Sequence, residues 1–331
     1  MKSLLFISPQ FHKKTGSNLF IRELYETKYK IDDCFLDWDS FDGVSNFFDK
    51  DYDLLICWQI TLTEKVINSL SYKRGVFFPM FDACKSVFKT EAWWSYRKFV
   101  IISFSSFLHK RLKIIGLDSY YIQYFPKVSL NDIRENKKSV FFWNRQTRIN
   151  INDVCKLFLE IEVNHIHWHK AVDPNQSIRN LNDEYLNHYN LTVTEWFDLK
   201  EEMYNCRDNS AYYFAPRRYE GIGHGFLEAM ATGRCVVAPN KPTMNEYIDD
   251  GENGLLYDPE NIKPLAMHNL EDIQRNTKSY MQEGRNKWNR NKSNILVWSE
   301  KKGNPKLIIL YFWLFIRFLR NPLKVSRYII K

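Results

Sequence analysis

The chain lacks the cysteine patterns of metal-binding modules and disulfide frameworks. Its six cysteines lie at 34, 57, 84, 155, 206 and 235, and none belongs to a Cys-x-x-Cys pair. Neither a zinc module nor a disulfide scaffold is therefore indicated. Reduced, buried thiols in a cytoplasmic protein are the expectation. The apolar run near the start, 4–7, is too short for a signal peptide and predicts a buried strand instead.

Acidic residues are missing from the last part of the sequence. Residues 301–331 contain eight Lys and Arg residues and no Asp or Glu. Because the chain has 47 basic and 39 acidic residues in all, its first 300 residues carry 39 of each sign. A nucleic-acid-binding protein more often spreads its basic residues over a folded face, so no nucleic-acid partner is expected. Basic residues interleaved with Leu, Ile, Phe and Trp fit an anionic membrane surface better.

This tail also lacks an apolar run of membrane-spanning length. The apolar residues of 307–319 make roughly 20 Å of helix, whereas the hydrocarbon core of a bilayer is about 30 Å thick. Asn321-Pro322 suits a helix restart. Spacings of three and four place the basic residues on one helical face, namely Arg317, Arg320, Lys324, Arg327 and Lys331. We expect 305–331 to form amphipathic helices on a membrane surface; the alternative is that 307–319 packs against the body of the protein.

Short apolar runs alternate with longer mixed segments along the remaining chain. This alternation predicts an α/β protein with parallel sheets and helices on both faces. A polar stretch, 131–138, interrupts the pattern, which then restarts, so we expect two Rossmann-like domains, 1–135 and 136–300, followed by the tail 301–331. The predicted strands are Leu4–Ser8, Asp33–Leu36, Leu54–Trp58, Val76–Pro79, Val100–Phe104, Tyr120–Tyr124, Val140–Trp143, Glu162–Trp168, Leu191–Thr194, Tyr212–Ala215, Cys235–Ala238 and Gly254–Tyr257.

The most informative segment is a glycine loop between a predicted strand and a predicted helix. It begins at Glu220, contains Gly221, Gly223 and Gly225, and leads to Glu228 in an apolar helical run. A strand, a glycine loop and a helix in this order make an anion site, because unpaired N–H groups and the positive end of the helix dipole face the ligand. A carboxylate in the first turns of such a helix can accept hydrogen bonds from a sugar diol. A pyrophosphate with an attached ribose satisfies both features.

The run from Tyr219 to Ala238 resembles the nucleotide-sugar site of retaining GT-B glycosyltransferases of family 4. The shared pattern is Glu-Gly-x-Gly, then Glu-Ala-Met-Ala-x-Gly and an apolar strand, with Glu246 and the turn Asp250–Gly254 following. The resemblance is specific over about 205–260 and only architectural in the N-terminal domain. It implies a GT-B fold, in which the two Rossmann-like domains face a cleft, and the Glu-x7-Glu motif of a nucleotide-sugar donor site.

The resemblance also implies roles for individual residues. Glu228 is expected to hold the ribose hydroxyls and Glu220 to lie beside the donor sugar as a catalytic residue. The backbone from Gly221 and Gly223 through His224 and Gly225 to Phe226 is expected to cradle the distal phosphate. A basic pair after the first strand of the second domain would neutralise the diphosphate, and the candidates are Arg145 and Arg148.

Two of these positions have structural alternatives. His224 replaces a residue that is usually apolar, so it either faces the sugar or merely caps the turn. Glu246 is a further donor-binding candidate, but the run from Thr243 to Glu246 also has the sequence pattern of a capping box.

Two possible metal-binding patterns are better explained by structure alone. Asp37-Trp38-Asp39 and Asp51-Tyr52-Asp53 match an Asp-x-Asp spelling, but they fall in the N-terminal domain and are interpreted as surface turns. The three histidines at 165, 167 and 169 share one strand face, but no cysteine or acid supports a metal site there. No metal or other cofactor is therefore expected.

Two N-terminal residues complete the list of candidates. Asp82 follows a predicted strand, where its carboxylate can orient an acceptor hydroxyl as a catalytic residue or cap a helix. Gly16, in the loop after the first strand, resembles the family's glycine loop near the donor phosphate.

Together these patterns predict a retaining glycosyltransferase that moves a sugar from a nucleoside-diphosphate donor to a glycan or lipid-linked acceptor. The tail adds an expected location, cytoplasmic and peripheral on the inner face of the cell membrane, as in bacterial surface polysaccharide synthesis. Two alternatives remain open. One is a GT-B-fold sugar-nucleotide epimerase, and the other is a non-catalytic nucleotide-sugar-binding scaffold at the membrane.

Overall fold

The computed structural model describes the chain except residues 38–39, 85–88, 130–137, 174 and 321–331. The chain divides into two compact units. The first comprises residues 1–123 together with the chain from 289 onward, and the second comprises 124–288. The sequence-based division after 135 falls among residues that the structure does not describe. The division after 300 differs from the structure, which assigns 289–300 to the first unit.

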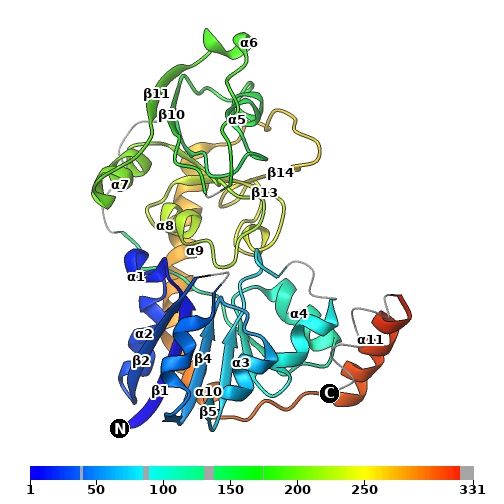
Figure 1. The fold of residues 1–331 in the computed structure, drawn as a ribbon. Helices are drawn as coiled ribbons and strands as arrows, with labels where there is room; N and C mark the ends of the chain where they lie inside the picture. Colours follow the sequence, from blue (N-terminus) through cyan, green and yellow to red (C-terminus); the bar gives the residue numbers. More distant parts are fainter. Residues whose placement is uncertain (38–39, 85–88, 130–137, 174, 321–331) are drawn as a thin grey trace. The chain divides into compact units, whose positions relative to one another are not determined.

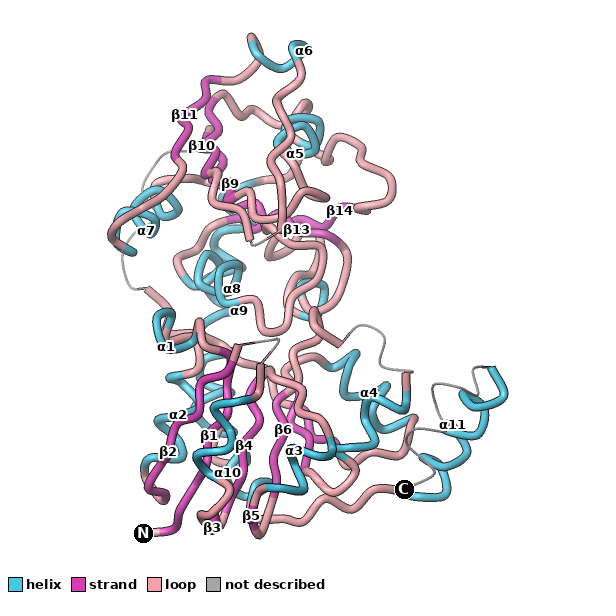
Figure 2. Tube along the Cα trace, viewed as in Figure 1, coloured by secondary structure: helices cyan, strands magenta, loops and turns pink. Residues whose placement is uncertain are grey.

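The first unit is built on a six-stranded parallel sheet, drawn in magenta in Figure 2. Its strand order is β2-β1-β4-β6-β7-β8, so the order reverses between β1 and β4. Every residue of β4 is buried, as expected for a central strand covered on both faces. The strands are β1 (Lys2–Pro9), β2 (Tyr29–Leu36), β4 (Leu54–Trp58), β6 (Gly75–Phe78), β7 (Val100–Ser103) and β8 (Ser119–Tyr121), with β3 (Asp51–Tyr52) and β5 (Ser71–Tyr72) forming a separate pair.

The helices of the first unit include two from the end of the chain. The structure defines α1 (His12–Thr15), α2 (Leu19–Glu26), α3 (Glu64–Ser69), α4 (Ser106–Ile114), α10 (Asn294–Ser299) and α11 (Leu307–Arg320), with the 3-10 helices η1 (Asp42–Phe47) and η2 (Thr90–Tyr96). The C-terminal segment is tied to this unit by several contacts. Tyr25 and Ser299 share a buried hydrogen bond of 2.6 Å, and Trp298 stacks on Tyr120. Residues 289–320 are therefore a structural part of the first unit.

The second unit contains the other six-stranded parallel sheet, in the order β11-β10-β9-β12-β13-β14. In chain order this is 3-2-1-4-5-6, the arrangement of a Rossmann fold, with its reversal between β9 and β12. The strands are β9 (Ser139–Trp143), β10 (His165–His169), β11 (Asn190–Thr194), β12 (Tyr212–Phe214), β13 (Cys235–Pro239) and β14 (Leu255–Tyr257). The helices are α5 (Ile151–Leu157), α6 (Asp183–Leu186), α7 (Lys200–Asp208), α8 (His224–Ala231) and α9 (Leu270–Asn291), with the 3-10 helix η3 (Met244–Glu246).

All twelve strands expected from the sequence overlap strands of the structure, which confirms the α/β class with two parallel sheets. Their apolar faces form the cores; in the second unit, Val140, Phe142 and Phe214 are fully buried. The interpretation of Asp51-Tyr52-Asp53 as a surface turn is wrong, because Asp51–Tyr52 form strand β3 and pair with β5. Asp53 pairs with Lys73 and accepts a hydrogen bond from the Ser3 backbone. The other Asp-x-Asp motif, which begins at Asp37, includes residues 38–39, which lie outside the described residues.

The tail forms a helix, as expected, but one of its faces packs on the first unit. Leu310 and Leu314 of α11 are buried, while Trp313 donates its indole N–H to the carbonyl oxygen of Ile114 in α4. Figure 1 shows α11 beside α4. The predicted restart at Asn321-Pro322 lies outside the described residues. Within the ranges that the structure describes, no helix has the length and hydropathy needed to cross a membrane.

Candidate donor site in the second unit

The candidate site lies at the strand-order reversal of the second sheet. In open parallel sheets the loops that leave the carboxyl ends of the two strands flanking such a reversal diverge and leave room for a ligand. The loop after β9 carries Arg145, and the loop after β12 carries Arg217 and the glycine loop. The residues that the sequence points to therefore emerge from the two strands on either side of the reversal.

The glycine loop leads directly into α8. Gly223 is the residue before the first helical position, with φ of 82°, and its carbonyl oxygen accepts the first helical hydrogen bond, from Leu227. The N–H groups of the first helical turn have no intrahelical acceptor, so they are available to an anion. The glycine loop thus leads into a helix start of the kind that can hold an anion, and the phosphate contact of Gly223 to Phe226 stays a prediction.

Two of the glycines are required by close contacts. A Cβ at Gly223 would lie 1.9 Å from the Phe226 ring, and a Cβ at Gly225 would lie 2.8 Å from the Tyr213 hydroxyl. Gly223 also needs its left-handed backbone conformation, which other residues rarely adopt. The sequence predicts the glycines, while the structure shows that Phe226 and Tyr213 are the side chains that exclude anything larger.

Arg145 belongs to a cluster that we call the arginine clamp: Arg145, Arg217 and Asp173. Arg145 donates from Nε and Nη2 to Asp173 Oδ1 at 2.9 and 2.6 Å, and Arg217 donates to Asp173 Oδ2 at 2.7 Å. Two guanidinium groups on one carboxylate leave one net positive charge at the carboxyl ends of β9 and β12. Such a cluster suits a diphosphate, which accepts hydrogen bonds from planar guanidinium groups.

Arg217 is a residue that the sequence analysis missed. Its position, immediately after Pro216 at the end of a strand and three residues before Glu220, is a signal that would have found it. Arg148, the other predicted member of the basic pair, is exposed, and in the described part of the chain no hydrogen bond or ion pair involves it. The structure therefore groups Arg145 with Arg217.

Glu228 lies in a second cluster, the α7–α8 ion cluster, which comprises Arg207, Asp208 and Glu228. The buried guanidinium of Arg207 contacts Glu228 Oε2 at 3.1 Å and holds Asp208 with two hydrogen bonds, of 2.7 and 3.2 Å. The Glu228 side chain is 36% exposed. Two carboxylates on one guanidinium leave one net negative charge, which suits a neutral diol rather than a phosphate.

Charged residues of both clusters influence the pKa of the same buried phenol, Tyr213 of β12. Burial and the carboxylate of Glu220 raise the pKa of Tyr213. The positive charges of Arg207 and Arg145 act in the opposite direction, and Glu228 adds to the rise. Since charge–charge interactions weaken with distance, all four charged side chains lie in the neighbourhood of Tyr213. The structure thus brings together the predicted residues Glu220, Glu228 and Arg145.

The backbone beside Glu220 is held from a neighbouring loop. The buried hydroxyl of Thr243 lies 2.7 Å from the Glu220 carbonyl oxygen and 3.0 Å from that of Gly221. The capping box suggested for Thr243 and Glu246 is wrong, because Thr243 makes no cap hydrogen bond and its hydroxyl is used by the glycine loop instead. Glu246 is half-buried in η3, and its predicted role in binding stays a prediction.

His224 is the first residue of α8, and its ring meets the ring of Tyr124 edge-on, with the centroids 5.2 Å apart. The residue before the helix is Gly223, so His224 does not serve as its cap. Whether the imidazole also meets a sugar stays a prediction.

The three histidines of β10 pair with threonine hydroxyls of β11. His167 and His169 both lie 2.9 Å from Thr194 Oγ1, and His165 lies 2.9 Å from Thr192 Oγ1. Burial, with a smaller effect of the neighbouring histidine, lowers the pKa of His167 and of His169 to about 4. Among the described residues no group of His, Cys, Asp and Glu has the geometry of a metal site.

These lowered pKa values make the second unit sensitive to acid. The unfolded chain binds protons on both histidines below about pH 6.5, whereas the folded chain binds them only near pH 4, so stability is lost as the pH falls through this window. We expect His167→Gln/His169→Gln to flatten the pH dependence of the urea midpoint between these limits, by up to about one proton for each histidine. The exposed His188, changed to Gln, is the control. An unaltered slope in the double variant would contradict the argument.

Asp82 and Gly16 belong to the first unit. Asp82 follows β6 in a turn, not at a helix start, and its carboxylate accepts a hydrogen bond from the Ala83 backbone at 3.0 Å. Gly16 ends α1 with φ of 63°. The same loop positions His12, which bridges Ser17 and Gln59 across the reversal of the first sheet. The catalytic role of Asp82 and the phosphate contact of Gly16 stay predictions.

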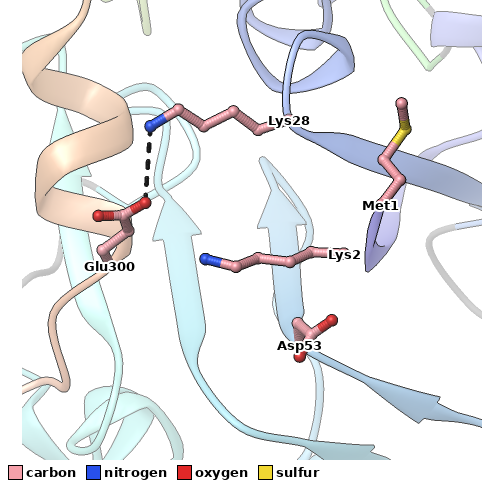
Figure 3. A pocket seen from close by; sticks show the side chains of 5 residues that line it. All are labelled: Met1, Lys2, Lys28, Asp53 and Glu300. Atoms are coloured by element: carbon pink, nitrogen blue, oxygen red, sulfur yellow. Dashed lines mark ion pairs between the residues drawn. The ribbon is translucent and has the colours of Figure 1, made fainter.

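One cavity in the first unit lies away from all these residues. It has a volume of about 620 Å³ and is lined by Met1, Lys2, Lys28, Asp53 and Glu300, as Figure 3 shows. Lys28 pairs with Glu300 at 3.6 Å. The cavity lies at the amino ends of β1 and β4, whereas parallel sheets bind ligands at the carboxyl ends of their strands, so it is not part of the candidate site.

Comparison with known sequences finds a family whose model matches most of the second unit. Residues 133–293 match the family described as Glycosyl transferases group 1. This segment is therefore similar to the glycosyl transferases group 1 family. The matched segment includes every site residue described above for the second unit, from Arg145 to Glu246. No curated protein shows a significant match to the chain.

Solved structures share the fold over most of the chain, beyond this segment. Sucrose-phosphate synthase from Thermosynechococcus elongatus has a TM-score of 0.60 at 13% identity, over 96% of this chain and 99% of that one. Alr3699/HepE of Anabaena, in complex with UDP and glucose, has a TM-score of 0.60 at 12% identity, over 90% and 100%. The lipopolysaccharide outer core galactosyltransferase WaaB has a TM-score of 0.54 at 14% identity, over 85% and 90%. The chain therefore has the GT-B fold, with a Rossmann-like sheet in each half.

Proposed function

We propose that the protein is a retaining glycosyltransferase that uses a nucleoside-diphosphate sugar. The observation that carries this proposal is the pair of oppositely charged clusters whose members Arg145, Arg207 and Glu228 all act on Tyr213 of β12. The arginine clamp suits the diphosphate and the α7–α8 ion cluster suits the ribose, with the N-terminus of α8 offering further donors. The similarity to the group 1 family and the resemblance of Glu220-x7-Glu228 to family 4 support the same ligand.

In this proposal the leaving diphosphate is the centre of the reaction. The bond between the anomeric carbon and the diphosphate oxygen breaks, and the acceptor oxygen bonds to the same face of that carbon. The acceptor proton passes to the departing phosphate oxygen. Arg145, Arg217 and the first-turn N–H groups of α8 stabilise the charge that develops on the diphosphate. Glu220 holds the donor sugar, and no metal is needed because the guanidinium groups supply the positive charge.

The decisive experiment incubates the protein with UDP-, GDP-, ADP- and dTDP-sugars and measures binding, slow hydrolysis and epimerisation. Hydrolysis of one donor is expected, and Glu220→Gln is expected to reduce it about 100-fold or more with unchanged folding. Glu184→Gln, an exposed carboxylate of the same unit, is the matched control. Epimerisation without transfer would indicate the epimerase alternative, and binding without any chemistry would indicate the scaffold.

We also propose that the acceptor is a glycan or a lipid-linked glycan at an anionic membrane surface. WaaB is a lipopolysaccharide outer core galactosyltransferase, and this chain shares its fold. The outer face of α11 supports the location. It is apolar and exposed, at 88% for Ile308, 57% for Phe312 and 56% for Phe315. Exposed lysines, Lys110 and Lys113, lie on α4, whose Ile114 carbonyl oxygen accepts the hydrogen bond from Trp313 of α11. An exposed apolar helical face combined with basic residues is typical of interfacial helices.

Charging this face should abolish membrane binding. Phe312→Glu/Phe315→Glu is expected to lower the fraction bound to vesicles of phosphatidylcholine with phosphatidylglycerol about tenfold or more. The change removes aromatic rings that the membrane would bury, and it adds two negative charges that the anionic surface repels. Deleting 305–331 is expected to have the same effect. Trp196→Glu, an equally drastic change at an exposed tryptophan of the second unit, is the control. Unchanged flotation of the deletion variant would refute the membrane proposal.

A further inference from the structure

The ion cluster between α7 and α8 contains a buried arginine that the proposed reaction does not itself use. Arg207, on the last turn of α7, is 6% exposed. A buried guanidinium is costly unless its donors are paired, and here three of its nitrogens have carboxylate partners. Nε and Nη2 hold Asp208, and Nη1 holds Glu228. Its planar group also lies over the Tyr204 ring, 4.7 Å from the centroid.

These contacts restrict the Glu228 side chain. The Glu228 side chain of α8 is half-buried, with 36% of its surface exposed. Such a glutamate has several rotamers, and ordering it costs conformational entropy. The 3.1 Å contact of Arg207 with Oε2 selects one orientation of the carboxylate before any ligand arrives.

The second carboxylate partner of Arg207, Asp208, is itself held by a further hydrogen bond. Asp208 receives a hydrogen bond of 3.2 Å from the hydroxyl of Thr232, the residue that follows the end of α8. The cluster therefore joins α7 to α8 at two points, through Glu228 and through Asp208. A planar guanidinium that bridges two carboxylates is suited to this task, since its fork fixes both partners in one plane.

We propose that Arg207 is a positioning residue that presents Glu228 to the ribose hydroxyls of the donor. This inference rests on the proposed function, in which Glu228 holds the ribose. It predicts a specific defect: loss of Arg207 lowers affinity for the ribose hydroxyls while the contacts to the diphosphate, made by the arginine clamp, persist. A merely structural role would weaken binding of all nucleotides equally.

The test measures, by calorimetry, the affinity of wild-type and variant proteins for the nucleoside diphosphate that binds best, and for its 2′,3′-dideoxy analogue. Wild type should prefer the ribonucleotide about tenfold or more, the value of a hydrogen bond to a charged group. Arg207→Met should reduce this preference to about twofold, with the dideoxy affinity nearly unchanged. Glu228→Ala should abolish the preference, and Arg207→Met should have no further effect in that background, because the two residues act as one unit.

Two further variants keep the result interpretable. Arg207→Lys keeps the charge but loses the fork, and should lower the preference while the protein folds even if Arg207→Met does not. Arg234→Met is the matched control, since Arg234 is an equally buried arginine of the same unit whose guanidinium donates to the Ser210 carbonyl oxygen. A full ribose preference in Arg207→Lys and Arg207→Met, or an equal loss for both nucleotides, would overturn the inference. Absence of any nucleotide binding by wild type would overturn the proposed function as well.

Discussion

Replacing Arg145 and Arg217 together by methionine is expected to reduce donor hydrolysis and transfer by at least about 1000-fold. Each guanidinium is a preorganised donor for the charge that develops on the leaving diphosphate, and removing one such donor commonly costs about 100-fold or more. The double change has a further cost. Asp173, which both arginines now neutralise at 2.6 to 2.7 Å, would become an unpaired carboxylate facing the diphosphate.

The single variants separate the two arginines. Arg217→Met leaves Asp173 paired with Arg145 through two hydrogen bonds, so it should cost less than the double change. Asp173→Asn should keep or tighten nucleotide binding, because the net charge becomes more positive, yet slow the reaction because neither guanidinium is oriented. This opposition between affinity and rate is characteristic of a clamp.

Binding and single-turnover hydrolysis of the donor are the measurements. Arg148→Met, at the exposed position that the sequence suggests, is expected to weaken binding less than Arg217→Met. Arg179→Met, an exposed arginine of the same unit, is the control for loss of one positive charge. Equal effects of the Arg148 and Arg217 variants would show that simple charge, and not the clamp, holds the diphosphate.

The strands could be predicted because each depends on neighbouring residues. Leu54–Trp58 is a continuous apolar run, and the strand has the same bounds because every position is buried. The prediction was less accurate where polar residues are buried. The predicted Glu162–Trp168 becomes His165–His169: the exposed Glu162 and Asn164 lie before the strand, while the buried His169 finds a hydroxyl partner on β11 and extends it.

The glycine loop could be predicted for the same reason: strand, loop and helix are contiguous. The clamp could not, because Asp173 lies 28 residues from Arg145 and 44 from Arg217, and no local spacing relates them. Thr243 illustrates the same limit. The sequence pattern that it forms with Glu246 favours a local capping box. The fold instead brings two carbonyl oxygens from 22 and 23 residues away, and the Thr243 hydroxyl donates to those.

The tail shows how a pattern can support two structures at once. Its apolar residues predict a helix, and the helix forms, but the sequence left open whether it meets a membrane or the protein. The helix is apolar around most of its circumference, so it packs Leu310 and Leu314 on the first unit and still exposes Ile308, Phe312 and Phe315. Packing on the body therefore does not exclude the proposed contact with a membrane.

Replacing Gly223 by alanine is expected to abolish nucleotide binding and to lower the free energy of unfolding by about 2–5 kcal/mol. One part of this cost is the left-handed backbone, at φ of 82°, which disfavours a side chain by about 1–2 kcal/mol. The other part is steric. The new Cβ would lie 1.9 Å from the Phe226 ring, which is itself buried, and overpacking of this kind costs about 1–3 kcal/mol.

The protein can relieve this clash only by moving the start of α8, and the first-turn N–H groups move with it. Binding should therefore fall about 100-fold or more even where the variant is folded, because a displacement of about 1 Å is enough to misplace a catalytic group. Denaturant unfolding and calorimetry with the nucleotide are the two measurements. Gly251→Ala is the matched control: its φ is 78°, but its Cβ would meet the ring of His268, an exposed side chain that can move.

A second substitution tests whether the steric argument is correct. Phe226→Leu removes the atoms that the new methyl group would meet, so the double variant Gly223→Ala/Phe226→Leu should recover part of the lost stability and binding relative to Gly223→Ala. The backbone cost would remain, so recovery should be incomplete. If Gly223→Ala binds nucleotide as wild type does, the start of α8 does not contact the diphosphate, and the anion site must lie with the arginine clamp alone.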